Sequence, residues 1–124
     1  MKLFPSLQKR YAKERFTAVQ AQRLAQEIAF GPVVFQVSRL MLKFGIFRLL
    51  SDNREGLSLE QISQKTELSR YAAQVLLEAS LTIGTVLVKD NQYILAKAGW
   101  FLLNDEMAQV LSLIHISEPT RLDV

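Results

Sequence analysis

The stretch from Leu57 to Trp100 constrains the fold most, because it carries the signals of two short helices in a fixed order. Ser58 and Gln61, three residues apart, match a capping box, in which each side chain meets a backbone N–H group at the start of a helix. Ser69 is a second helix cap, and apolar residues then recur at helical spacing from Tyr71 to Ile83. We therefore predict two helices joined by a short turn.

A β-hairpin is expected after the second helix. Gly84 is the predicted stop, because a residue without Cβ enters the left-handed region freely. Two runs rich in strand-forming residues follow, Thr85 to Val88 and Gln92 to Leu95, on either side of Lys89-Asp90-Asn91. Asp-Asn is an acceptable tight-turn pair, since both residues tolerate positive φ.

A third helix is expected from Lys97 to Met107, with Trp100 packed in the core. Two helices, a hairpin and a closing helix follow the element order of a winged helix-turn-helix. We therefore predict a fold that is mainly α with a small β-hairpin, in which residues 57–107 form the winged-helix unit and apolar helices precede it.

The first half of the chain is expected to be helical. Residues 6–30 are rich in Ala, Gln and Arg and predict one long helix. Gly31-Pro32 is expected to end it and to start another, since Gly suits a helix end and Pro a first turn. The second helix, residues 32–50, is apolar on nearly every face, with a break at Gly45. Three cations within it argue against a membrane span, because each costs about 2.5–3.5 kcal/mol near a bilayer centre.

This apolar segment predicts a dimer. One small domain cannot cover so many apolar faces, and large exposed patches normally mark an interface. We therefore predict that residues 1–56 form a helical dimerisation segment and that the chain forms a homodimer; the alternative is a monomer that encloses the segment. The residues expected at the interface are Phe35, Leu40, Met41, Phe44 and Phe47.

The charge pattern bears on nucleic-acid binding. Residues 1–50 carry nine cations and two anions, whereas residues 51–124 carry six cations and ten anions. A recognition helix needs polar side chains for base edges and cations for phosphates. The polar stripe of the predicted helix is Arg70, Gln74 and Glu78, with zero net charge. A DNA-binding transcriptional regulator is therefore the alternative function, and no nucleic-acid partner is favoured.

Little in the chain points to chemistry. The absence of cysteine removes disulfides, thiolate chemistry and the usual structural zinc sites, and fits a cytoplasmic protein. The single histidine, His115, lies in a tail, residues 108–124, that opens no recognisable domain. From about residue 111 the tail resembles translated sequencing-adaptor read-through, and we expect it to be non-native. We predict no catalytic, cofactor-binding or metal-ligating residue.

About residues 30–107 resemble the N-terminal dimerisation region of class I S-adenosylmethionine-dependent methyltransferases, the O-methyltransferase-like group. The resemblance begins with a Gly-Ile-Phe helix, continues through the predicted helices and ends with Phe-Leu-Leu-Asn-Asp after the hairpin. The segments that carry it are Gly45–Leu49, Leu57–Ser69, Val75–Gly84, Tyr93–Gly99 and Phe101–Asp105.

The resemblance implies a domain that intertwines with its partner subunit and helps to roof the substrate pocket. In that family the cofactor lies in a separate α/β domain, in a glycine-rich turn that the five scattered glycines here cannot form. We therefore expect the dimerisation and substrate-lid domain of a truncated methyltransferase, which transfers a methyl group from S-adenosylmethionine to a small molecule. The chain alone is expected to bind no cofactor and to be inactive.

Overall fold

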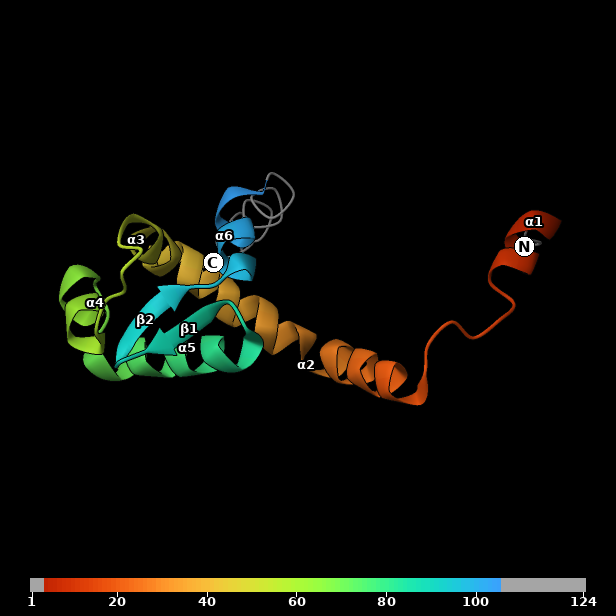
Figure 1. The fold of residues 1–124 in the computed structure, drawn as a ribbon, viewed down its shortest axis with the longest axis horizontal. Coiled ribbons are helices and arrows are strands. Elements are labelled where there is room, and N and C mark those ends of the chain that lie inside the picture. The colour runs from red at the N-terminus through yellow and green to blue at the C-terminus, as the bar shows by residue number, and fades with distance from the viewer. Residues whose placement is uncertain (1–3, 106–124) are drawn as a thin grey trace, which may run out of the picture. The chain divides into compact units, whose positions relative to one another are not determined.

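The computed structural model describes residues 4–105, which form six helices and one two-stranded sheet (Figure 1). The fold is mainly α with a small β-hairpin, as the sequence predicts. The chain divides into two compact units, Met1–Pro32 and Val33–Val124. The elements are α1 (Pro5–Arg10), α2 (Ala18–Lys43), α3 (Ile46–Asp52), α4 (Leu59–Lys65), α5 (Arg70–Ile83), β1 (Val86–Lys89), β2 (Gln92–Leu95) and α6 (Lys97–Asn104).

The first unit corrects the prediction of one long helix over residues 6–30. Helix α1 ends at Arg10, and α2 begins only at Ala18. The start of α2 is a capping box: the Thr17 Oγ1 atom accepts from the Gln20 N–H group at 3.2 Å, and Gln20 Oε1 accepts from the Thr17 N–H group at 3.0 Å. These reciprocal bonds satisfy two backbone donors that would otherwise lack partners, and they begin the helix there.

The prediction that Gly31-Pro32 separates two helices is also wrong, because α2 runs through Pro32 to Lys43. A proline inside a helix removes one backbone donor and leaves the carbonyl four residues earlier without its usual partner. That carbonyl belongs to Ile28, which is 68% exposed, so water can take the place of the missing N–H group. The helix therefore tolerates Pro32 in its interior, although the sequence analysis placed a helix boundary there.

In the second unit, the predicted break at Gly45 is confirmed. Gly45 has a φ of 75°, a left-handed conformation that glycine adopts readily, and α3 begins immediately after it. The turn lets the end of α2 and the whole of α3 contribute to one core. Four of the fully buried side chains in that core are Met41, Ile46, Phe47 and Leu50.

Helices α4 and α5 are the two predicted helices joined by a short turn. The Ser58 Oγ atom accepts from the Gln61 N–H group at 3.2 Å, while Gln61 Oε1 accepts from the Ser58 N–H group at 2.9 Å, which confirms the capping box. The second predicted cap is also present, since the Ser69 Oγ atom accepts from the Ala72 N–H group at 3.1 Å. Both helices therefore begin where the sequence places them.

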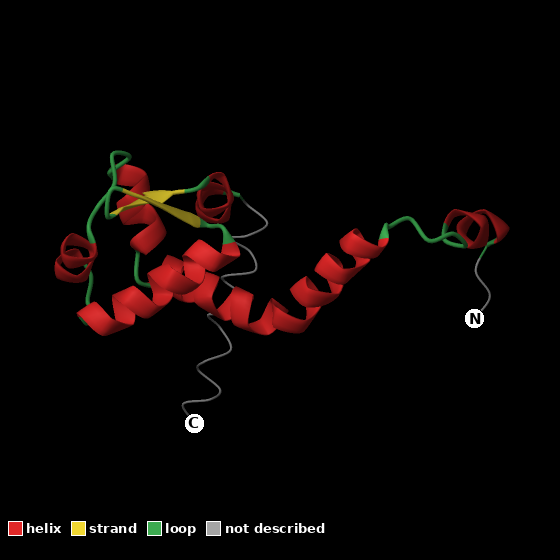
Figure 2. Cartoon of the chain, turned by 60° about the horizontal axis from the view of Figure 1, so that its bottom comes forward, coloured by secondary structure: helices red, strands yellow, loops and turns green. Residues whose placement is uncertain are grey.

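Strands β1 and β2, drawn in yellow in Figure 2, form an antiparallel hairpin, and β1 contacts α5. Its turn contains Asp90 and Asn91, with φ values of 52° and 62°, as expected for the tight turn. Val86 pairs with Leu95 at the open end of the hairpin, and its side chain is buried. An isolated bridge between Leu57 and Tyr93 ties the segment before α4 to the outer side of β2.

Helix α6 packs tightly at the start of β1. A Cβ atom at Gly99 would lie 2.5 Å from the Thr85 carbonyl oxygen, so only glycine fits this approach. The predicted core position of Trp100 is wrong: its side chain is 43% exposed, because Gly99 and Leu103 occupy the buried side of α6. Helix α6 ends at Asn104. Met107, His115 and the proposed non-native tail lie outside the described residues.

Candidate dimerisation surface

The part of α2 within the second unit has two different sides. Val37, Leu40 and Met41 pack on or in the core of the unit. At about 100° per residue, Phe35 lies roughly 160° around the helix from Val37. Phe35 is 39% exposed, and Val33 is 61% exposed. This segment therefore buries one apolar side within its own subunit and presents further apolar surface to solvent.

The part of α2 within the first unit is apolar but not buried. No residue from 4 to 32 falls in the buried class. Leu24 and Ile28, one helical turn apart, are 40% and 68% exposed. Val19 and Phe30 lie on another side and are 75% and 62% exposed. A helix with two exposed apolar sides is an unusual arrangement for a monomer, and it is typical of a helix that packs against another chain.

The five predicted interface residues do not share one environment. Phe35 is exposed, and Leu40 and Phe44 are half-buried. Met41 and Phe47 have no exposed surface, because both belong to the core of the second unit. The exposed side chains of α2 that were not predicted at the interface are Val19, Leu24, Ile28, Phe30 and Val33. They belong to the same continuous helix as Phe35, but the expected break at Gly31-Pro32 hid this continuity.

The outward stripe of α5 is paired within the subunit. The Arg70 Nε atom donates to Glu60 Oε1 at 2.9 Å, and Gln74 Nε2 donates to Glu78 Oε1 at 3.1 Å. The Arg70 guanidinium lowers the pKa of the Glu60 carboxyl through this bond. On the same exposed side lies Tyr71, which is 76% exposed. The surface of α5 thus combines internally paired charges with apolar groups.

Over residues 4–105, no three His, Asp or Glu side chains are grouped closely enough to hold a metal ion. None of the helices in this same range combines the length and the hydropathy needed to cross a bilayer.

Residues 22–93 match the model of the Dimerisation2-like domain. This match covers more than half of the sequence and includes most of α2, the helix-turn-helix and the hairpin as far as Tyr93. The chain belongs to the Dimerisation2-like domain family. No curated protein matches its sequence.

Solved structures of two methyltransferases have a similar fold. The S-adenosylmethionine-dependent methyltransferase SibL, in its apo form, has 27% sequence identity and a TM-score of 0.61, over 75% of this chain and 27% of SibL. Human N-acetylserotonin methyltransferase, in complex with SAM, has 20% identity and a TM-score of 0.55, over 76% of this chain and 28% of the enzyme. The chain therefore spans just over a quarter of the length of these proteins.

Proposed function

We propose that this chain is the dimerisation domain of an S-adenosylmethionine-dependent methyltransferase and that it pairs two subunits through α2. The observation that carries the proposal is a set of apolar side chains along α2, each at least 39% exposed, in a member of a dimerisation-domain family. Fully burying one such side chain stabilises by about 1.5–3 kcal/mol. The set comprises Val19, Leu24, Ile28, Phe30, Val33 and Phe35.

The similarity to SibL supports the methyltransferase part of the proposal. SibL is much longer than the segment that this chain matches. In a parent enzyme of this kind, the methyl transfer and the binding of S-adenosylmethionine would belong to a domain that corresponds to the unmatched remainder of SibL. The acceptor would be a small molecule, and this domain would help to cover its pocket. Of the five residues predicted at the interface, Phe35 is the one we place on this surface, with Leu40 and Phe44 at its edge. The cytoplasmic location stays a prediction from the sequence.

Sedimentation velocity of the purified chain tests the dimer. We expect the 14.1 kDa chain to sediment as a dimer. Phe35→Glu should raise its dissociation constant by about 100-fold or more, because the interface would then bury an unpaired carboxylate. The matched control is Gln36→Glu, which adds the same charge one residue away and keeps an oxygen to accept from Arg39, whose Nε atom now donates to Gln36 at 3.3 Å.

Two outcomes would contradict the proposed interface. One is a wild-type chain that remains monomeric at concentrations well above the micromolar range. The other is equal dissociation of both variants, which would show that added charge alone, rather than loss of apolar contact, separates the subunits. Circular dichroism of each variant checks that the helices remain folded.

DNA binding is the second candidate function, and the observation in its favour is the exposed α5 of a helix-turn-helix. The pairing of Arg70 with Glu60 works against it, since that cation is already engaged by a carboxylate. A titration with duplex DNA at low and moderate salt separates the two functions. Binding that weakens steeply with salt would support a regulator, whereas no binding at low salt would leave the dimerisation domain.

A further inference from the structure

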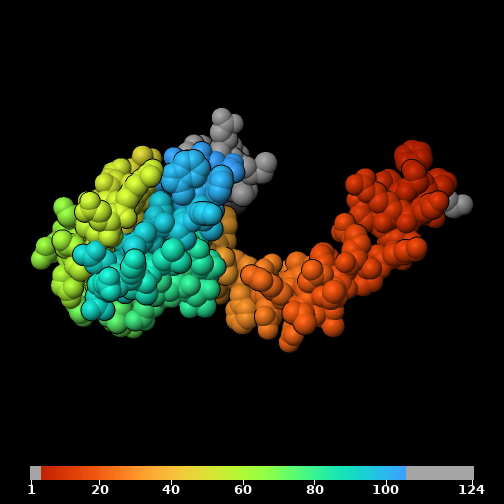
Figure 3. All heavy atoms as spheres, viewed as in Figure 1, coloured from red at the N-terminus to blue at the C-terminus, as the bar shows by residue number. Residues whose placement is uncertain are grey.

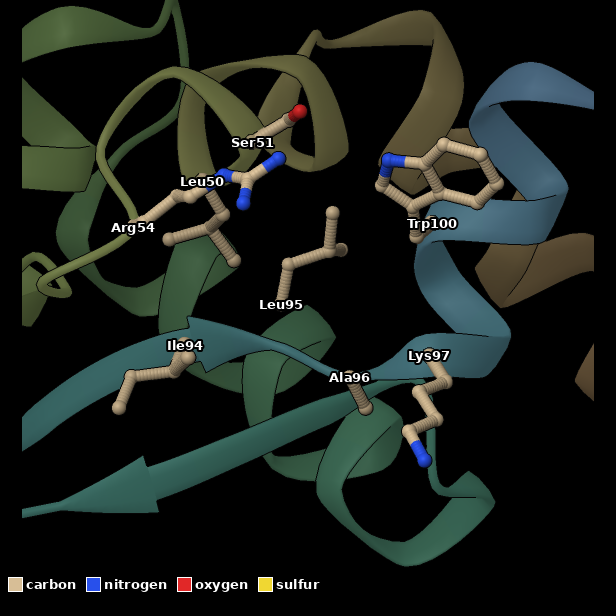
Figure 4. Close-up of a pocket in the computed structure, with 8 residues that line it drawn as sticks. All are labelled: Leu50, Ser51, Arg54, Ile94, Leu95, Ala96, Lys97 and Trp100. Carbon is tan, nitrogen blue, oxygen red and sulfur yellow. The ribbon is translucent and has the colours of Figure 1, made fainter.

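A pocket of about 410 Å³ lies among α3, β2 and α6 in the second unit (Figure 4). In the space-filling view, the surfaces of α3 (yellow), β2 (cyan) and α6 (blue) lie side by side (Figure 3). The apolar lining of the pocket comes from Leu50, Ile94 and Leu95. A volume of this size and an apolar lining are typical of small-molecule sites.

The polar side chains that line this pocket can all donate hydrogen bonds, and only the Ser51 hydroxyl among them can also accept. Figure 4 shows the Arg54 guanidinium and the Trp100 indole on opposite sides, with the indole nitrogen directed toward the guanidinium. The Ser51 hydroxyl lies beside Arg54, whereas the Lys97 ammonium points away from this group. Guanidinium and indole can only donate, so the ligand they suit is one that only accepts, and a carboxylate is such a group.

Arg54 is available for a ligand. Asp52 and Glu55 are close to it in sequence, and the three residues line a neighbouring hollow. Within residues 4–105, however, Arg54 forms no ion pair with either carboxylate or with any other. Among the described residues, none that lines the pocket is acidic. The guanidinium is thus directed into a space that offers it no anion from the described part of the subunit.

We propose that this pocket binds a small organic carboxylate with an aromatic or similarly flat apolar body. The Arg54 guanidinium would pair with the carboxylate, the Trp100 indole N–H and the Ser51 hydroxyl would act as further donors, and Leu95 would contact the apolar body. None of the described residues that line the pocket belongs to α2, and the proposed binding does not depend on the proposed dimer or on the methyltransferase activity.

Titration of the 124-residue chain with benzoate tests this proposal by nuclear magnetic resonance. Trp100 is the single tryptophan of the sequence, so one indole N–H signal reports on the pocket. We expect benzoate to shift that signal saturably and benzamide, its neutral analogue, to bind at least about tenfold more weakly. Arg54→Gln should weaken benzoate binding by about 10- to 100-fold, the usual loss for a charge-assisted hydrogen bond. Arg48→Gln is the matched control, because this cation on α3 does not line the pocket and should leave binding unchanged.

Three results would overturn the proposal. The first is the absence of a saturable shift up to about 10 mM benzoate, a concentration at which even a weak site of this kind is occupied. The second is equal binding of benzoate and benzamide, because the carboxylate would then contribute nothing. The third is equal loss of binding in the Arg54 and Arg48 variants, which would indicate attraction to the overall charge of the chain rather than to this pocket.

Discussion

The two units of this chain use similar apolar residues in opposite ways. In the second unit, residues such as Phe47 and Ile62 have no exposed surface. In the first unit, Ile28 and Phe30 are 68% and 62% exposed, although they belong to a regular helix. The apolar content of a segment therefore does not tell whether its own subunit covers it. In a dimerisation domain, the exposed apolar residues are expected to be buried by a second copy.

The largest expected difference between the two units is the loss in free energy of unfolding when one apolar side chain in each unit is truncated. Phe47→Ala should lower the free energy of unfolding by about 3–5 kcal/mol, because it leaves a cavity in the core. Ile28→Ala should cost no more than about 0.5 kcal/mol in a monomeric Phe35→Glu background, because the residue is exposed there. Urea denaturation followed by circular dichroism measures both values.

The Ile28→Ala truncation also tests whether the two units really differ in how their apolar side chains are covered. In the chain without Phe35→Glu, Ile28→Ala should become more costly as the protein concentration rises, because unfolding then also separates the dimer. If Ile28→Ala costs the same in both backgrounds and at all concentrations, its side chain contacts only its own subunit. The two units would then not differ in the way we infer.

A smaller difference is expected between the two capping boxes, which have nearly the same geometry. Ser58→Ala should lower the free energy of global unfolding by about 1 kcal/mol, because α4 is packed into the second unit. Thr17→Ala should leave global unfolding of the monomer unchanged and should speed hydrogen exchange only in the first turn of α2. Urea denaturation measures the global stability of both variants, and amide hydrogen exchange measures the local opening of α2. A global loss of stability from Thr17→Ala would show that the start of α2 is part of the cooperative core.

The smallest effect concerns the ion pair between α4 and α5. The hydrogen bond from Arg70 holds the pKa of Glu60 below its ordinary value. The ionised carboxylate is therefore favoured in the fold, so its contribution is present above the ordinary pKa of a glutamate and is lost as the pH falls through the lower folded pKa. A pH titration by nuclear magnetic resonance should show this lowered pKa.

Two variants distinguish the effect of the Arg70–Glu60 ion pair on the pKa of Glu60 from the effect of the overall charge of the protein. Arg70→Gln should return the pKa of Glu60 toward its ordinary value. Arg23→Gln removes a cation of the first unit that pairs with Glu27 within one helix, and it should leave the Glu60 titration unchanged. An unchanged pKa in Arg70→Gln would mean that Arg70 is not the cause.

Local signals made much of the second unit predictable. The caps at Ser58 and Ser69, the turn at Asp90-Asn91 and the break at Gly45 depend on bonds or dihedral angles within a few residues. The length of α2 was less predictable. Pro32 is a strong local signal for a helix boundary, yet α2 continues through it to Lys43. The pocket could not be predicted, since Arg54 and Trp100 are far apart in sequence and meet only when α3 and α6 pack together.

By itself, the sequence determined the order of the elements from α3 to α6, the small hairpin and the presence of more apolar surface than one small domain would cover. Only the tertiary structure decided which apolar side chains remain exposed. Met41 is buried and Phe35 is exposed, although both were equally good interface candidates in the sequence. The physical reason is that burial depends on which side of a helix meets the rest of the chain, and that contact joins residues distant in sequence.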